Sequence, residues 1–214
     1  KLTPVQRQII IIGIAYGIWY LHKNNVVHGC LCPRAIWLDK NYYPKIFKMD
    51  PLLYGSNIKY QDLYLLSESD EGPIKESDVF SFGRLMYYLI TGFEPFQMKD
   101  DPLYKIPTFS FLMRINKGEF PLIPEYVPES LRDLLERCWR PDPNERPTMK
   151  EIFYLISYKK LYINDFQPNE DFQKFNLFID EVLTSEFNTE FGLVIECNEE
   201  ATIDIKLEDQ KKNS

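Results

Sequence analysis

Residues 28–39, HGCLCPRAIWLD, place a histidine, two cysteines and an arginine close together, and such side chains could bind metal or transfer protons. A zinc site needs about four ligands, usually as repeated C-x-x-C or C/H pairs. The whole chain has four cysteines and two histidines, and it lacks that spacing. We therefore expect Cys30, Cys32, Cys138 and Cys197 to be reduced and mostly buried thiols, with no metal bound.

The elements that must position this segment can be read from its flanks. Thr3-Pro4-Val5-Gln6 has the pattern of a capping box with proline at the first helical position, which predicts a helix to about Lys23. Short apolar runs at 26–31 and 35–39, followed by NYYPKIF at 41–47, indicate short strands. The last two are expected to form a hairpin, so that strands frame the loop.

The second half of the chain is predominantly helical in pattern. A polar, turn-rich stretch at 54–75 predicts a long loop. Residues 77–92, SDVFSFGRLMYYLITG, are apolar on nearly every side and predict a central buried helix, capped by Ser77 and ended by Gly92. Further helices are predicted at 108–116, 129–138, 148–161 and 172–183.

Composition excludes several classes of partner. With 214 residues and a net charge of −7, the chain lacks the clustered basic residues that grip nucleic acid or anionic membrane. The apolar run at 9–21 is too short to span a bilayer and contains Gly13 and Gly17, so it predicts a buried core helix. The sequence starts at Lys1 without a signal peptide, and we expect a cytoplasmic piece of a longer protein.

Two further motifs carry a family resemblance. Residues 76–96, ESDVFSFGRLMYYLITGFEPF, and residues 138–152, CWRPDPNERPTMKEI, are similar to the central helix and the closing segment of a protein kinase C-terminal lobe. Residues 1–162 as a whole resemble that lobe, most closely in the tyrosine-kinase-like branch.

The resemblance implies a mainly α (α+β) fold, with helices around a central buried helix and a small β-hairpin. The kinase N-terminal lobe is absent from the sequence. Residues 163–214 are then a C-terminal extension, with an amphipathic helix and an acidic, partly disordered tail at 186–209.

In kinases the loop at 28–35 reads H-R-D-L-K-P-E-N, where the aspartate accepts the substrate proton, the lysine steadies the phosphoryl group and the asparagine holds magnesium. This sequence has Cys30, Cys32 and Ala35 at those three positions. A thiol with a pKa of ~8.5 is mostly neutral at pH 7 and cannot replace the carboxylate. Alanine has no oxygen for a hard cation. Gly29 also replaces the arginine that pairs with an activation-loop phosphate.

The metal-binding D-F-G motif has two possible placements. The favoured one puts Lys48-Met49-Asp50 on the motif, which exchanges the acidic ligand for a base. The other lengthens the hairpin by two residues and puts Asp50 on the metal. Neither placement repairs Cys30 and Ala35.

Residues that support the kinase fold, rather than its reaction, are retained. The resemblance implies that His28 and Met49 belong to the hydrophobic spine and that Asp78 braces the catalytic-loop backbone. It also implies that Arg146 forms a buried ion pair with the acid that ends the activation segment. Asp62 is the candidate partner, because an unpaired buried charge is costly.

Two residues bear on nucleotide binding. Trp37 occupies the position under the adenine, where it could stack on a base or fill the space itself, and we favour occlusion. Lys48 offers a metal-independent point charge for a phosphate.

The sequence therefore predicts a pseudokinase that acts as a protein-interaction or signalling scaffold, with protein partners, at most vestigial ATP binding and no required cofactor. The alternative is an active protein kinase that uses ATP and magnesium when joined to its N-terminal lobe.

Overall fold

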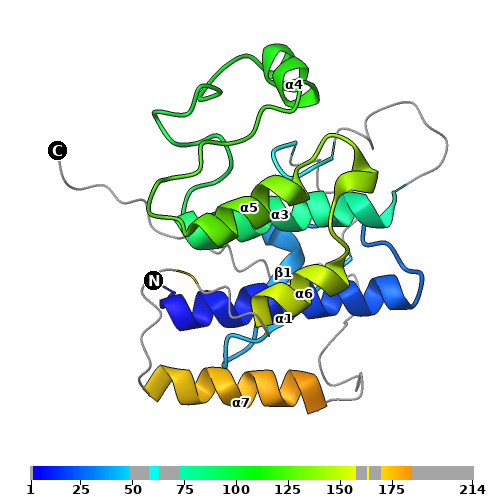
Figure 1. Ribbon diagram of the computed structural model, residues 1–214, viewed down its shortest axis with the longest axis vertical. Coiled ribbons are helices and arrows are strands. Elements are labelled where there is room, and N and C mark those ends of the chain that lie inside the picture. Colours follow the sequence, from blue (N-terminus) through cyan, green and yellow to red (C-terminus); the bar gives the residue numbers. More distant parts are fainter. Residues whose placement is uncertain (1, 49–57, 63–72, 158–162, 164–169, 185–214) are drawn as a thin grey trace.

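The computed structural model describes residues 2–48, 58–62, 73–157, 163 and 170–184, and its arrangement is shown in Figure 1. The described part is rich in helix and has one two-stranded antiparallel sheet, as the sequence predicted. In chain order the elements are α1 (Pro4–Lys23), η1 (Pro33–Ala35), β1 (Ile36–Leu38), β2 (Pro44–Ile46), α3 (Lys75–Thr91), α4 (Thr108–Asn116), α5 (Glu129–Cys138), η3 (Pro143–Glu145), α6 (Met149–Ser157) and α7 (Glu170–Thr184).

Helix α1 begins with the predicted capping box. The Gln6 backbone N–H donates to Thr3 Oγ1 at 3.2 Å, and the Thr3 N–H donates to Gln6 Oε1 at 2.8 Å. α3, α6, α7 and β2 all pack against α1, which explains why its apolar residues are not confined to one face.

The two glycines of α1 allow β2 to approach the helix. A Cβ atom on Gly13 would lie 2.5 Å from Cγ of Pro44, and one on Gly17 would lie 2.6 Å from Cδ1 of Ile46. Both distances are shorter than real contacts allow, so only glycine fits at these positions. The interruptions in the apolar run at 9–21 are thus packing sites for the hairpin.

Helix α3 is buried along most of its length, at every residue from Ser77 to Ile90. Gly92 ends it in the left-handed conformation, with φ of 77°, and its N–H donates to the Tyr88 carbonyl, as predicted. The predicted N-cap was wrong. The helix begins at Lys75 with Ile74 as N-cap, and Ser77 lies in the first turn, where its hydroxyl donates to Asp62 Oδ2 at 3.1 Å.

A buried cation lies on α3. Arg84 is 1% exposed, and its guanidinium carbon lies 4.9, 4.7 and 4.5 Å from the ring centroids of Phe80, Phe96 and Trp139. Burial lowers the pKa of Arg84 to about 9. Cation–π attraction from three rings partly offsets the cost of desolvating this charge.

The run at 26–31 does not form a strand, contrary to expectation. Its backbone donors are used in another way, because the N–H groups of His28 and Gly29 donate to the Asp78 carboxylate rather than to a neighbouring strand. The other two predicted strands pair as a hairpin, with Ile36 opposite Ile46 and Leu38 opposite Pro44.

The three helices after α3 fall close to their predicted bounds. α6 starts at Met149 beside a capping box in which Glu151 Oε2 accepts from the Thr148 N–H at 2.7 Å. It is described as far as Ser157, and the predicted remainder to 161 lies outside the described residues.

Helix α7 covers the predicted amphipathic segment and packs on α1. Its inner face consists of Phe175, Phe178 and Val182, all buried. The acidic segment at 186–209 lies outside the described residues. No helix in the described part of the chain has the length and apolar character to cross a membrane.

Candidate functional site

The loop that follows α1 is held by one carboxylate from α3. Asp78 Oδ2 accepts the N–H of His28 at 2.8 Å, and Asp78 Oδ1 accepts the N–H of Gly29 at 2.8 Å. His22, at the end of α1, lies with Nε2 2.9 Å from Asp78 Oδ2. Asp78 is 1% exposed, so these contacts form away from water, where charge-assisted hydrogen bonds are strong.

Sequence reasoning singled out Asp78 but missed His22. His22 lies in the last turn of α1, six residues before His28. That short separation, which lets one carboxylate reach both residues, is the signal that could have identified His22.

His28 connects the loop to the hairpin. Its Nε2 lies 2.8 Å from the carbonyl oxygen of Phe47, and its Nδ1 lies 3.3 Å from the backbone N–H of Cys30. Nε2 therefore donates and Nδ1 accepts, which is the arrangement of a neutral ring. Burial, which outweighs the nearby Asp78 charge, lowers the pKa of His28.

Cys30, Cys32 and Ala35, the three residues that the resemblance puts at catalytic positions, differ in their burial. Cys32 is 7% exposed, and burial raises the pKa of its thiol, so the side chain is neutral at physiological pH. Ala35, at the end of η1, is fully buried. Cys30 is partly exposed. None of the three side chains supplies an oxygen ligand or a carboxylate base.

Gly29 adopts a left-handed backbone with φ of 77°. A Cβ atom there would lie 3.1 Å from both Cβ and Cγ of Pro73, the residue that precedes α3 by two positions. Space for a side chain at position 29 is therefore restricted by Pro73.

The hairpin carries Trp37 and is followed by Lys48. Trp37 lies on β1 opposite Lys45, is partly exposed, and packs edge-on against Phe47 with ring centroids 5.8 Å apart. The Phe47 N–H donates to the Ala35 carbonyl at 2.9 Å, so the ladder continues one step beyond β2. Lys48 follows and is exposed. Met49 and Asp50 lie outside the described residues.

The structure brings Arg146 and Asp62 together. Arg146 Nη1 lies 2.5 Å from Asp62 Oδ2, and the side chains are 1% and 4% exposed. Arg146 also donates to the backbone carbonyls of Glu76, Arg140 and Pro141. These contacts join the start of α3 to the loop before α6 and satisfy most of the guanidinium donors.

The donor chemistry of this site does not fit a magnesium ion. Mg²⁺ takes oxygen ligands in an octahedral arrangement, whereas positions 30, 35 and 48 present a thiol, a methyl group and an ammonium group. Within the described ranges, no group of three or more His, Cys, Asp or Glu side chains could hold a metal.

Comparison with known proteins agrees with this architecture. Residues 1–156 match the family model of protein tyrosine and serine/threonine kinases. The dual specificity protein kinase shkB of Dictyostelium discoideum is 33% identical over 151 residues, an alignment that covers 64% of this chain and 22% of that protein. The serine/threonine-protein kinase STY46 of Arabidopsis thaliana is 28% identical over 155 residues, covering 67% of this chain and 25% of that protein.

A longer alignment exists with the dual specificity protein kinase pyk3 of Dictyostelium discoideum, which is 29% identical over 206 residues. It covers 86% of this chain and 14% of that protein. An alignment of that extent must reach beyond residue 156. The chain spans a quarter or less of each of these three relatives, and by its family match it belongs to the protein tyrosine and serine/threonine kinase family.

Proposed function

We propose that this chain is the C-terminal lobe of a pseudokinase, which positions protein partners and transfers no phosphate. The observation that carries the proposal is the state of the catalytic loop. Asp78 binds its backbone through two hydrogen bonds of 2.8 Å, while Cys30, Cys32 and Ala35 occupy the positions that need a base, a cation and a metal ligand.

The missing groups account for most of the catalysis that a kinase requires. Loss of a general base typically removes ~10² to 10⁴ of rate. Phosphoryl transfer depends further on metal ions that neutralise charge on the phosphates. Because the buried Cys32 thiol is neutral, the lysine charge at that position is lost as well.

The rival function is an active kinase that uses Asp50 as its metal ligand. The hairpin register supports the pseudokinase instead. The strand pairs from Ile36–Ile46 to Leu38–Pro44 follow one another without an inserted residue. The Phe47 N–H then donates to the Ala35 carbonyl, so Lys48 is the next residue after the paired strands. An acid at position 50 would still lack a base at 30 and an asparagine at 35.

A phosphotransfer assay tests the proposal on the protein joined to its N-terminal lobe. We expect no transfer from ATP to a generic protein substrate above the level of a heat-denatured control. A variant with the four family side chains carries Cys30→Asp, Cys32→Lys, Ala35→Asn and Lys48→Asp. Any phosphotransfer activity should appear only in this variant. Transfer by the unaltered protein would contradict the proposal.

Trp37 carries a separate prediction about nucleotide occupancy. It packs against Phe47 and is only partly exposed, which supports a role in filling the space under the adenine. Replacement of Trp37 by leucine should increase nucleotide affinity by about tenfold, equivalent to ~1.4 kcal/mol. Equilibrium binding of a fluorescent adenine nucleotide measures this, with Trp19→Leu, at the α1–α6 contact, as the matched control. No gain in Trp37→Leu would contradict occlusion.

A further inference from the structure

Helix α4 has two apolar faces, and one of them faces solvent. Phe111 and Ile115 point inward and form a small cluster with Phe96 and Leu103. Phe109 and Met113 are also four residues apart, but they lie about 200° further round the helix than the inner pair. Phe109 is 75% exposed and Met113 is 47% exposed.

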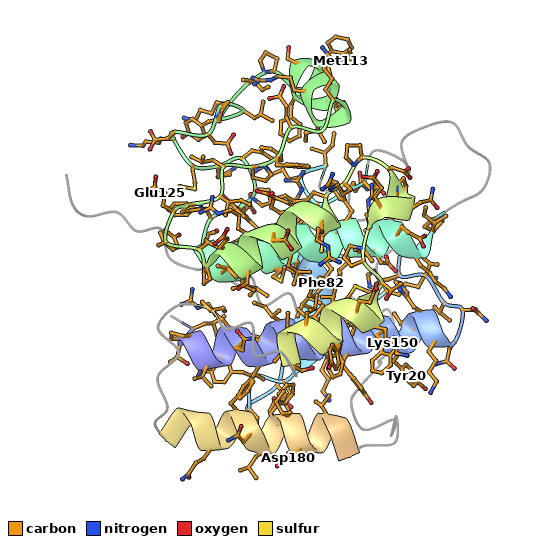
Figure 2. All side chains as sticks on the ribbon, viewed as in Figure 1. Tyr20, Phe82, Met113, Glu125, Lys150 and Asp180 are labelled. Carbon is orange, nitrogen blue, oxygen red and sulfur yellow. The ribbon has the colours of Figure 1, made fainter. Side chains whose placement is uncertain are left out.

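Leu112 extends the outer face, since it lies three residues after Phe109 and is partly exposed. We call Phe109, Leu112 and Met113 the outer face of α4. Figure 2 shows Met113 on α4, at the end of the molecule opposite α7. Singly exposed apolar residues are ordinary on a protein surface, whereas three on one face at i, i+3 and i+4 indicate a contact surface.

Two exposed lysines lie near the ends of α4. Lys105 lies three residues before the helix and Lys117 is its C-cap residue, and both are exposed. The third cation, Arg114, is neutralised by Glu119, with Nη2 2.5 Å from Oε2. The Debye length is ~8 Å at physiological salt, so these local lysines, rather than the net charge of −7, set the preference for a partner.

We propose that the outer face of α4 binds an acidic amphipathic helix of a partner protein. A ridge of side chains at i, i+3 and i+4 packs into the groove of a second helix. Acidic residues on the flanks of that helix would meet Lys105 and Lys117. The inference rests on the proposed scaffold function and names the surface and the class of partner through which it acts.

A second copy of the chain fits this face poorly. In a two-fold symmetric contact each patch meets its own counterpart, so the lysines of one copy would approach the lysines of the other. Like charges placed opposite one another oppose association. A partner with acidic flanks avoids this repulsion.

Fluorescence anisotropy with two labelled peptides tests the proposal. Each peptide is an amphipathic helix of about 14 residues with leucines at i, i+3, i+4 and i+7. One has glutamates at its polar positions and the other has lysines. The glutamate peptide should bind the unaltered chain, and Phe109→Ser with Met113→Ser should weaken binding by at least about tenfold.

A matched control distinguishes binding at this face from nonspecific hydrophobic binding elsewhere on the surface. Leu177 on α7 is 62% exposed, so Leu177→Ser removes a comparable exposed side chain at a distant site and should leave binding unchanged. The pair Lys105→Glu with Lys117→Glu should reverse the preference toward the lysine peptide. All the substituted side chains are exposed, and circular dichroism should show unchanged helix content.

Four results would overturn the proposal. The first is equal binding of the glutamate peptide to the unaltered chain and to the Phe109→Ser, Met113→Ser variant, and the second is no preference between the two peptides. The third is a dimer of the unaltered chain, seen in sedimentation, that this variant abolishes. The fourth is peptide binding only after removal of the acidic residues 185–214. The last two would assign the face to a second copy or to the chain's own segment. The phosphotransfer assay is independent of all four, so failure of the scaffold function and failure of this surface are distinguishable.

Discussion

The carboxylate of Asp78 binds the loop backbone without contribution from the side chains at positions 30, 32 and 35. Both of its oxygens accept backbone N–H groups, from His28 and from Gly29. Substitutions at positions 30 and 32 therefore leave these bonds intact. The backbone of this loop is therefore supported independently of the chemistry of the side chains at positions 30 and 32.

The Arg146–Asp62 pair should be costly to break. Removing one partner leaves the other charge buried and unpaired, which typically costs ~3 to 5 kcal/mol. We expect Asp62→Asn to lower the free energy of unfolding by that order, as measured by urea denaturation. Arg140 and Glu145 form an exposed pair with 3.8 Å between Nη1 and Oε2. Glu145→Gln is the matched control and should cost less than ~1 kcal/mol. Equal effects would contradict the assignment.

His28 should make stability depend on pH. Because its folded-state pKa lies below the ordinary value of 6.5, the unfolded chain binds the proton more readily. The stabilisation is fully present above about pH 6.5 and is lost as the pH falls through the lowered pKa. Urea midpoints measured between pH 8 and pH 5.5 should therefore fall with pH, and His28→Gln should flatten that slope. An unchanged slope in the variant would show that another group is responsible.

At the scale of elements, the hairpin contacts both α1 and α7. Pro44 and Ile46 of β2 fill the sites opened by Gly13 and Gly17, and Tyr43 lies 4.9 Å from the ring centroid of Phe178 on α7. The C-terminal helix thus braces the hairpin that presents Trp37 and Lys48. This packing makes α7 part of the lobe's structure.

Removal of the Phe178 ring should test that brace. Phe178 is fully buried, and truncation of a buried phenylalanine to alanine typically costs ~3 to 5 kcal/mol. The neighbouring Leu177 is 62% exposed, so Leu177→Ala should be nearly neutral. Thermal or urea unfolding followed by circular dichroism measures both. A near-neutral Phe178→Ala would mean that α7 does not stabilise the lobe.

The approach of β2 to α1 gives a second prediction at this scale. A methyl group on Gly13 would overlap Pro44, with 2.5 Å between Cβ and Cγ. Overpacking of this kind usually costs ~1 to 3 kcal/mol. Gly13→Ala should therefore destabilise the protein even though alanine is the better helix former by ~1 kcal/mol. A stabilised variant, in the same unfolding experiment, would show that β2 can move away.

Local sequence patterns predicted the positions of most helices. They failed where a side chain or backbone group has a partner far away in the sequence. The capping boxes at Thr3 and Thr148 and the glycine at 92 act within one turn, so their sequence patterns predicted the ends of helices. Ser77 has the right type for an N-cap, but Asp62, fifteen residues earlier, accepts its hydroxyl. The strand expected at 26–31 failed for a similar reason, because Asp78 takes its backbone donors.

The candidate site divides in the same way. Resemblance to a family motif named Asp78, Arg146 and Asp62 in advance, and the structure shows their contacts. The role of Gly13 could not be read from the sequence, because it depends on which strand crosses the helix. His22 was missed because its partner, Asp78, lies 56 residues later in the sequence.

At the scale of the whole molecule, residues 1–156 match the protein kinase family and form a helix-rich part of a kinase domain. Nucleotides in protein kinases lie under a glycine-rich loop and contact a lysine, and both belong to the other lobe. Kinase activity in this family therefore depends on both lobes. In the proposed alignment, Cys30 and Ala35 supply neither a carboxylate base nor an asparagine oxygen.

Calorimetric titration of ATP, with and without magnesium, into the protein joined to its N-terminal lobe tests the central claim most directly. With Ala35 and Lys48 at the metal positions, magnesium should not increase ATP affinity. We predict no binding in either buffer because Trp37 fills the adenine position. Weak magnesium-independent binding would contradict occlusion by Trp37 and favour a phosphate contact from Lys48. Binding that requires magnesium would place Asp50 on the metal and contradict the pseudokinase account.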